Sequence, residues 1–204
     1  MSGLENDDPD RDARFTCLDP DAMLRVAESY LEAHDSRRDP KVIAAYRQLE
    51  AQTDVLFESL TRNIRIAFTQ CSTPYSSDRE MISAARTEKL LEIPTARNDA
   101  DNDHPFFGRE FGGAYDRFRA VHDFLGHVRL NAGFDRQGEY LTWLEQDRHY
   151  KGLARWALAT ELHGKNSVLC TTGETAVPKA TLLDRRVLWR SRVGMGFSPG
   201  TALC

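Results

Sequence analysis

Two histidines five residues apart, His122 and His127, are the side chains of this sequence best suited to metal chemistry. They flank a Leu-Gly pair, and Glu161 follows on a later stretch with helical spacing. Two imidazoles and one carboxylate make up the 2-His-1-carboxylate facial triad, which holds iron(II) and leaves coordination positions open for oxygen and a second molecule. If these three side chains converge, the sequence predicts an oxygen-activating enzyme with a mononuclear non-haem iron site.

The spacing of the two histidines conflicts with an ordinary helix. On a helix that advances by about 100° per residue, His122 falls on the same arc as Phe118 and Val121 and therefore points into the core. The same rotation carries His127 about 140° away from His122. Because glycine often ends a helix, we expect the helix to finish at Gly126 and the chain to turn His127 back.

Glu161 is notable for its surroundings in the sequence. On a helix through residues 153–162 it falls in the middle of an apolar arc that includes Leu158 and Leu162. An ionised carboxylate among aliphatic side chains costs several kcal/mol unless it is paired or bound to a cation. A metal held by the two histidines would provide that cation, and a salt bridge to Arg119 or to the pair at residues 185–186 is the alternative.

A family resemblance supports the metal interpretation. Residues 122–128, His-Asp-Phe-Leu-Gly-His-Val, resemble the His-Glu-Leu-Leu-Gly-His-Val signature of pterin-dependent aromatic amino acid hydroxylases, and residues 155–162 are similar to the later Trp-Phe-Thr-Val-Glu segment of that family. The resemblance implies that His122, His127 and Glu161 bind Fe(II). It places Asp123 where the family has a glutamate beside the pterin, and it implies tetrahydropterin as the electron donor.

The resemblance also implies a substrate class and a fold. The expected reaction is hydroxylation or desaturation of a small molecule by O2, with an amino acid as the favoured substrate. The expected fold is mainly α, a single helical domain with a few short strands, like the catalytic core of the hydroxylases. Residues 118–166 are also similar to uncharacterised bacterial and phage proteins, a similarity that names no reaction.

Three further side chains are candidates for binding the substrate. Arg109 precedes the metal helix and could hold a substrate carboxylate through two hydrogen bonds. Arg119 lies one turn before His122 on the same helix. Trp156 could shape an apolar pocket, since small-molecule sites are mostly apolar with few polar anchors.

Size and charge exclude several other classes of protein. At 204 residues the chain can bury one sizeable core, and we expect a leader at residues 1–18 followed by one domain at 19–204. The net charge is −4, with 27 basic residues dispersed among 31 acidic ones, so nucleic acid is not an expected partner. No stretch approaches the ~20 apolar residues of a membrane span. We expect a cytoplasmic protein whose cysteines are free thiols, and self-association is compatible with the sequence.

The elements that must position the site are mostly helices. Asp-Pro pairs at residues 19–20 and 39–40 predict two helix starts, and Ser77 with Glu80 predicts a capping box. The apolar stripe of the second helix extends toward Ile64 or Ile66. The remaining expected elements are a strand at 89–93, a loop at 94–107 that could act as a lid, helices near 112–126, 136–147 and 150–163, and an irregular or β-containing C-terminal part.

Three other functions remain open at this stage. The pair His122-Asp123 could belong to a metal phosphohydrolase of the HD type or to a di-iron oxygenase, which would need further ligands such as His104 and Asp184. A non-catalytic helical interaction protein with a closed structural metal is the third. A 2-oxoglutarate dioxygenase is less favoured, because its His-x-Asp ligand pair does not occur at these histidines.

Overall fold

Two helices introduced by proline open the part of the chain that the structure describes. The computed structural model describes residues 18–95, 104, 106 and 110–192, so almost all of the predicted leader and most of the predicted lid loop lie outside it. α1 (Pro20–Glu32) follows Asp19, and α2 (Pro40–Thr61) follows Asp39; each aspartate accepts hydrogen bonds from backbone N–H groups of the first turn. Both predicted helix starts are confirmed.

A two-stranded parallel sheet follows α2. β1 (Arg65–Thr69) pairs with β2 (Leu90–Pro94), and α3 (Asp78–Thr87) makes the crossover between them. The predicted strand at 89–93 is confirmed, but β1 was expected to continue the stripe of α2. α2 ends at Thr61 instead, because β-branched and aromatic residues such as Ile66 fit a pleated ladder beside β2.

The helix that carries the two histidines does not end at Gly126. α4 (Ala114–His122) passes directly into a π-helical turn at Asp123–Val128. The expected role of Gly126 as a helix end was therefore wrong. A Cβ atom at this glycine would lie only 1.8 Å from Cγ2 of Thr142, on the neighbouring helix α5 (Arg136–Asp147), so glycine is required here for close packing of the two helices.

A second helical run has the same construction. α6 (Ala154–Ala159) passes through a π-helical turn at Thr160–Gly164 into α7 (Lys165–Thr172). The C-terminal part, which was expected to be irregular or to contain β-structure, instead includes α8 (Arg185–Arg192). α8 forms because Leu188 on its inner side is buried in the main hydrophobic cluster.

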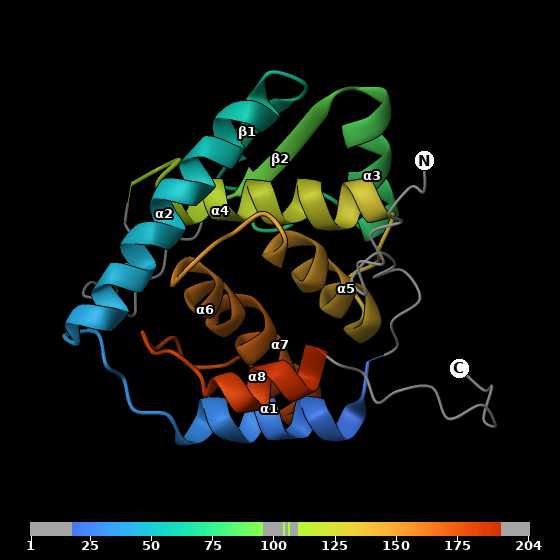
Figure 1. Cartoon of the computed structure of the whole chain (residues 1–204). Helices are drawn as coiled ribbons and strands as arrows, with labels where there is room; N and C mark the ends of the chain where they lie inside the picture. The colour runs from blue at the N-terminus through green and yellow to red at the C-terminus, as the bar shows by residue number, and fades with distance from the viewer. Residues whose placement is uncertain (1–17, 96–103, 105, 107–109, 193–204) are drawn as a thin grey trace, which may run out of the picture.

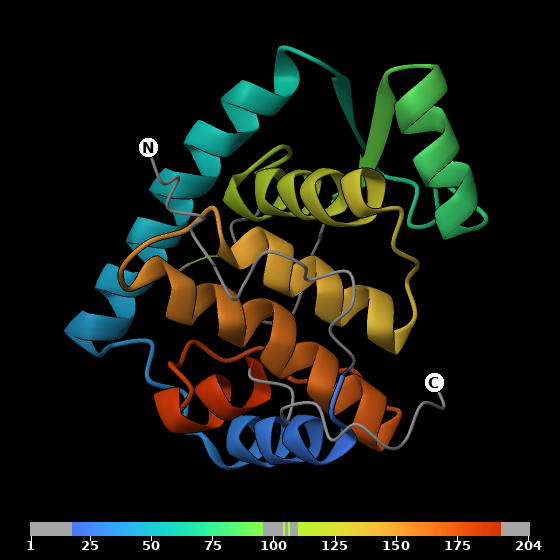
Figure 2. The same ribbon diagram turned by 45° about the vertical axis from the view of Figure 1, so that its right-hand side comes forward.

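The helices pack around two apolar clusters. In Figures 1 and 2, α1 and α8 lie side by side at one end of the molecule, and the two strands with α3 lie at the other. The larger cluster includes Leu49, Phe118 and Leu158, and the smaller one, beneath the strands, includes Ile93 and Val121. α4 contributes to both clusters, so the histidine helix lies at their boundary.

This architecture confirms a mainly α fold with short strands, while the likeness to a hydroxylase core remains a prediction. Across the described residues, no helix combines the length and the apolar character needed to cross a membrane.

His163 is a buried histidine whose titration should affect stability. Its ring is stacked on Trp143 with centroids 4.0 Å apart, and burial lowers its pKa to about 3. Below the unfolded-state pKa of 6.5, the unfolded chain takes up a proton that the folded chain does not. This group therefore removes about 1.4 kcal/mol of stability per pH unit as the pH falls below about 6.5.

We expect His163→Gln to lose this pH dependence. Urea unfolding of both proteins at pH 7.5, 6.0 and 5.0 measures it, and the stability advantage of the parent over the variant should shrink as the pH falls. A constant difference at all three pH values would contradict the assignment.

Candidate metal centre

The π-helical turn brings His122 and His127 to the same side of their helix. Hydrogen bonds of a π-helix join residues five apart, so one turn closes on the fifth residue rather than the fourth. The two imidazole rings lie with centroids 5.0 Å apart and planes at 84°. The widened turn thus removes the 140° conflict that an ideal α-helix imposes.

Glu139, in the first turn of α5, completes a three-residue constellation. Its Oε2 lies 3.4 Å from Nε2 of His122, and its Oε1 lies 3.4 Å from Nε2 of His127. Hydrogen bonds between N–H and oxygen usually span about 2.7–3.2 Å. Two ligand atoms at about 2.1 Å from one divalent ion lie about 3.0 Å apart at 90° and about 3.4 Å apart at the tetrahedral angle. The three side chains are therefore spaced as ligands of a single ion would be.

The outer nitrogen of each imidazole is held by an oxygen. Nδ1 of His127 lies 3.0 Å from the carbonyl oxygen of Ala132, which can only accept, so Nδ1 carries the proton and donates it. Nδ1 of His122 lies 3.0 Å from Oε1 of Gln146. Metal-binding histidines are held in this way, because a hydrogen bond at one nitrogen leaves the lone pair of the other for the ion.

The charges of the three groups are coupled. Burial by itself would raise the pKa of Glu139, but hydrogen bonds and charge from His122 and His127 outweigh burial and lower that pKa to about 2. Burial by itself would lower the pKa of His122, but Glu139 and Asp123 raise it. A cation entering this position therefore displaces protons from the imidazoles, and its affinity rises with pH over the range in which they titrate.

Asp123 is the fourth group at this position. One of its carboxylate oxygens and one ring nitrogen from each of His122 and His127 lie within 4.8 Å of one another. Burial raises the pKa of Asp123. Asp123 can therefore serve as a further ligand or as a polar group in the wall beside the ion.

A cavity of about 410 Å³ opens beside these side chains. This volume is within the range of small-molecule sites. The lining comes from the loop after β1, the end of β2, α4 with its π-helical turn, and single residues of later segments: Ser72, Thr73, Pro74, Tyr75, Met81, Glu92, Pro94, Tyr115, Phe118, Arg119, His122, Asp123, His127, Phe134, Glu139 and Leu162.

Of the predicted substrate residues, Arg119 lines this cavity. Its Nη1 donates to the carbonyl oxygen of Pro94 at 2.6 Å, and no acidic side chain of the described residues forms an ion pair with it. Trp156 lies elsewhere, in a separate hollow, and Arg109 lies outside the described residues. Sequence reasoning did not single out Phe134, which is 49% exposed at the cavity and has its ring centroid 4.8 Å from that of His127.

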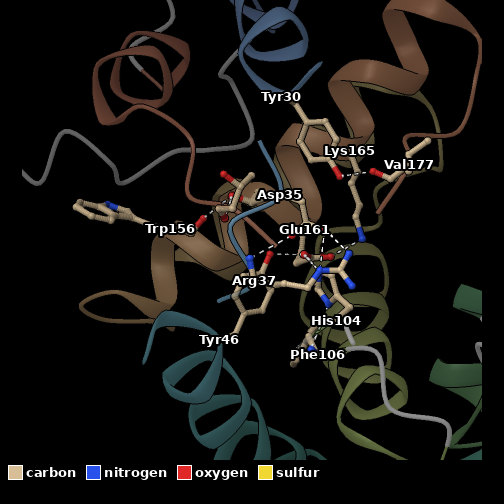
Figure 3. Close-up of polar contacts among 12 residues, drawn as sticks. Tyr30, Asp35, Arg37, Tyr46, His104, Phe106, Trp156, Glu161, Lys165 and Val177 are labelled. Carbon is tan, nitrogen blue, oxygen red and sulfur yellow. Dashed lines mark hydrogen bonds and ion pairs between the residues drawn. The ribbon is translucent and has the colours of Figure 1, made fainter. Parts of the chain in front are cut away.

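Glu161 is buried in a different polar cluster, which Figure 3 shows. Its Oε1 accepts a hydrogen bond of 2.6 Å from the hydroxyl of Tyr46 and lies 3.6 Å from Nε2 of His104, while its Oε2 pairs with the ammonium of Lys165. The expectation that this carboxylate needs a partner is confirmed. Its contacts are with these residues and not with His122 or His127, and a small cavity of about 230 Å³ is lined by both Glu139 and Glu161.

The additional ligands that a dinuclear HD-type site would need are not assembled around His122. His104 lies in the Glu161 cluster, and Asp184 is an exposed residue that accepts from the backbone N–H of Arg186 at the start of α8. Within the described residues, the metal-binding groups gathered at His122 are Asp123, His127 and Glu139.

The pairing of Glu161 with Lys165 gives an asymmetric stability prediction. The Glu161 side chain has no exposed surface, whereas that of Lys165 is 17% exposed. Lys165→Met should leave a buried carboxylate without its ammonium and cost about 3 kcal/mol of unfolding free energy. Glu161→Gln should cost less, because Lys165 can turn toward water. Urea unfolding of both variants tests this, and equal costs would contradict it.

Comparisons of the chain with protein-family models, curated protein sequences and solved structures return no match.

Proposed function

We propose that this protein is a non-haem iron(II) enzyme that uses O2 to oxidise a small molecule, with His122, His127 and Glu139 as the iron ligands. The observation that carries the proposal is the position of Glu139, with one oxygen 3.4 Å from Nε2 of each histidine. Sequence reasoning assigned the carboxylate to Glu161; the proposal assigns it to Glu139 because Glu161 has other partners.

The donor set agrees with iron(II). Two imidazoles and one carboxylate form the facial triad of oxygen-activating iron enzymes, and bound iron would supply the activation of O2. The chain itself fixes the ligands through Gln146 and the Ala132 carbonyl. It also limits the access of water, since the His127 side chain is 1% exposed and the Glu139 side chain 24%.

The cavity supports an amino acid as substrate and tetrahydropterin as reductant. Arg119 can offer guanidinium N–H groups to a substrate carboxylate, a contact that favours a bidentate pair. Tyr115 and Phe118 give the same cavity an aromatic wall. The carboxylate of Asp123 can accept hydrogen bonds from the N–H groups of a planar heterocycle, and the exposed ring of Phe134 can stack on it.

Anaerobic loading with Fe(II), followed by oxygen-uptake measurements across a panel of amino acids, tests this function. Each assay is run with tetrahydropterin, with 2-oxoglutarate and with neither. We expect one iron per chain and oxygen uptake that depends on substrate and on tetrahydropterin. Turnover without a pterin would remove the cofactor but keep the iron site, whereas two metals per chain would contradict the mononuclear site.

A closed zinc site is the second candidate, because Asp123 lies close enough to be a fourth ligand. Four protein ligands around zinc make a closed structural site, whereas three leave a position for reaction. Asp123→Asn separates the two: metal affinity should stay near the parent value for the iron triad and fall for a four-ligand site.

A further inference from the structure

A second hollow lies away from the metal cavity and shares no lining residue with it. It has a volume of about 270 Å³ and is formed by α5, α6 and α8, with Trp143, Asp147, Gly152, Arg155, Trp156, Ala159, Arg185 and Leu188 in its walls. In Figure 3 the Trp156 ring points away from the Glu161 cluster. The hollow is therefore a separate feature of the fold.

Two cations share the indole ring of Trp156. The ammonium of Lys41 and the guanidinium carbon of Arg185 each lie 4.7 Å from its ring centroid. No acidic side chain of the described residues forms an ion pair with either cation. Cation–π contacts at exposed sites contribute only about 0.5–1 kcal/mol, so the ring does not replace an anion for either group.

The nearby carboxylate is already engaged. Asp147 is almost fully buried and accepts hydrogen bonds from Nε of Arg155 at 3.1 and 3.0 Å, together with a contact from Nη2 of the same guanidinium. Asp147 therefore compensates Arg155. The charges of Lys41 and Arg185 remain, and they make this hollow positive in a chain whose net charge is −4.

We propose that this hollow binds a small aromatic oxyanion, a carboxylate or phosphate carried on a planar apolar group. The oxyanion pairs with Arg185, whose guanidinium matches the geometry of both groups. The planar group packs against the exposed part of Trp156. The volume fits a ligand of about one ring with its anionic substituent, below the usual range for drug-sized molecules.

Benzoate and phenyl phosphate are the probes, and benzyl alcohol is the neutral comparison. Each is titrated into ¹⁵N-labelled protein while the indole N–H signals are followed, with Trp156→Phe identifying the Trp156 signal. Both anions should shift that signal to saturation, and the stronger one identifies the preferred oxyanion. Benzyl alcohol should bind at least about tenfold more weakly, since it lacks the charge-assisted hydrogen bonds.

Arg185→Gln should weaken benzoate binding at least about tenfold. Arg186→Gln is the matched control, because it removes the same charge from an exposed neighbour that does not line the hollow. Glu139→Gln should bind benzoate as the parent does, which keeps the result independent of the metal centre. Equal affinities of the two arginine variants, equal binding of benzyl alcohol, or no saturable shift with either anion would overturn the proposal.

Discussion

Glu139→Gln should abolish tight metal binding while the protein stays folded. Glutamine keeps the size of the side chain but replaces the anionic oxygens, so the ion loses one of three ligands and the charge that offsets its own. Losing a residue that merely supports a ligand typically costs 10–100-fold in metal affinity. We therefore expect a loss of at least about a hundredfold, measured by competition with a chelator of known affinity under anaerobic conditions.

Glu161→Gln is the matched control for this experiment. It makes the same chemical change at the carboxylate that sequence reasoning had assigned to the metal, on a residue whose partners are Tyr46 and Lys165. We expect it to bind metal with an affinity within a few-fold of the parent. The reverse pattern, with Glu161→Gln losing the metal and Glu139→Gln keeping it, would refute Glu139 as the ligand. Thermal unfolding of both metal-free variants shows whether each is folded.

The sequence contained a signal for Glu139 that periodicity could have detected. On the predicted helix 136–147, Glu139, Trp143 and Gln146 are spaced i, i+4 and i+7, which puts a carboxylate, an indole and an amide on one face. The structure places Glu139 against both imidazoles and Gln146 behind one of them. Which loop-separated helix faces the histidines is a tertiary fact, and no local pattern states it.

The partner of Glu161 was also predictable in principle. Lys165 follows it by four residues, the spacing at which a glutamate and a lysine pair along a helix. The π-helical turns could not be predicted in the same way. The five-residue interval between His122 and His127 indicated that an ordinary helix fails, but two solutions exist, a helix end at glycine and a widened turn. Packing against Thr142 decides between them, and that contact joins separate segments of the chain.

The helix starts were predictable because their causes are local. Asp19 and Asp39 cap the helices that begin at the following prolines, and Ser77 accepts a hydrogen bond from the N–H of Glu80 as the capping-box pattern requires. β1 and α8 were missed for the opposite reason. A strand of five residues is stabilised by its partner β2, and a helix of eight residues by the core beneath Leu188.

Gly126→Ala should weaken both the fold and the metal site. The added Cβ would lie 1.8 Å from Cγ2 of Thr142, and the contact must widen by 1.2 Å to reach 3.0 Å, a separation below which real Cβ contacts are essentially not found. Overpacking of this kind costs about 1–3 kcal/mol. Because Thr142 lies three residues after Glu139, moving α5 also moves the carboxylate away from the histidines. Metal sites tolerate errors of only about 0.5 Å, so affinity should fall at least about tenfold.

Thr142→Ala provides the rescue that separates packing from any special need for glycine in the π-helical turn. It removes the Cγ2 and Oγ1 atoms that the new methyl group meets at 1.8 and 2.8 Å, leaving the Cβ of residue 142 at 2.7 Å. Oγ1 of Thr142 is buried and makes no hydrogen bond within the described residues, so its removal sacrifices no polar contact. The double variant should therefore recover most of the stability and metal affinity lost by Gly126→Ala. If the double variant is as weak as Gly126→Ala alone, the glycine is required by the backbone of the turn itself. If Gly126→Ala binds metal as the parent does, the close approach of α5 does not position Glu139.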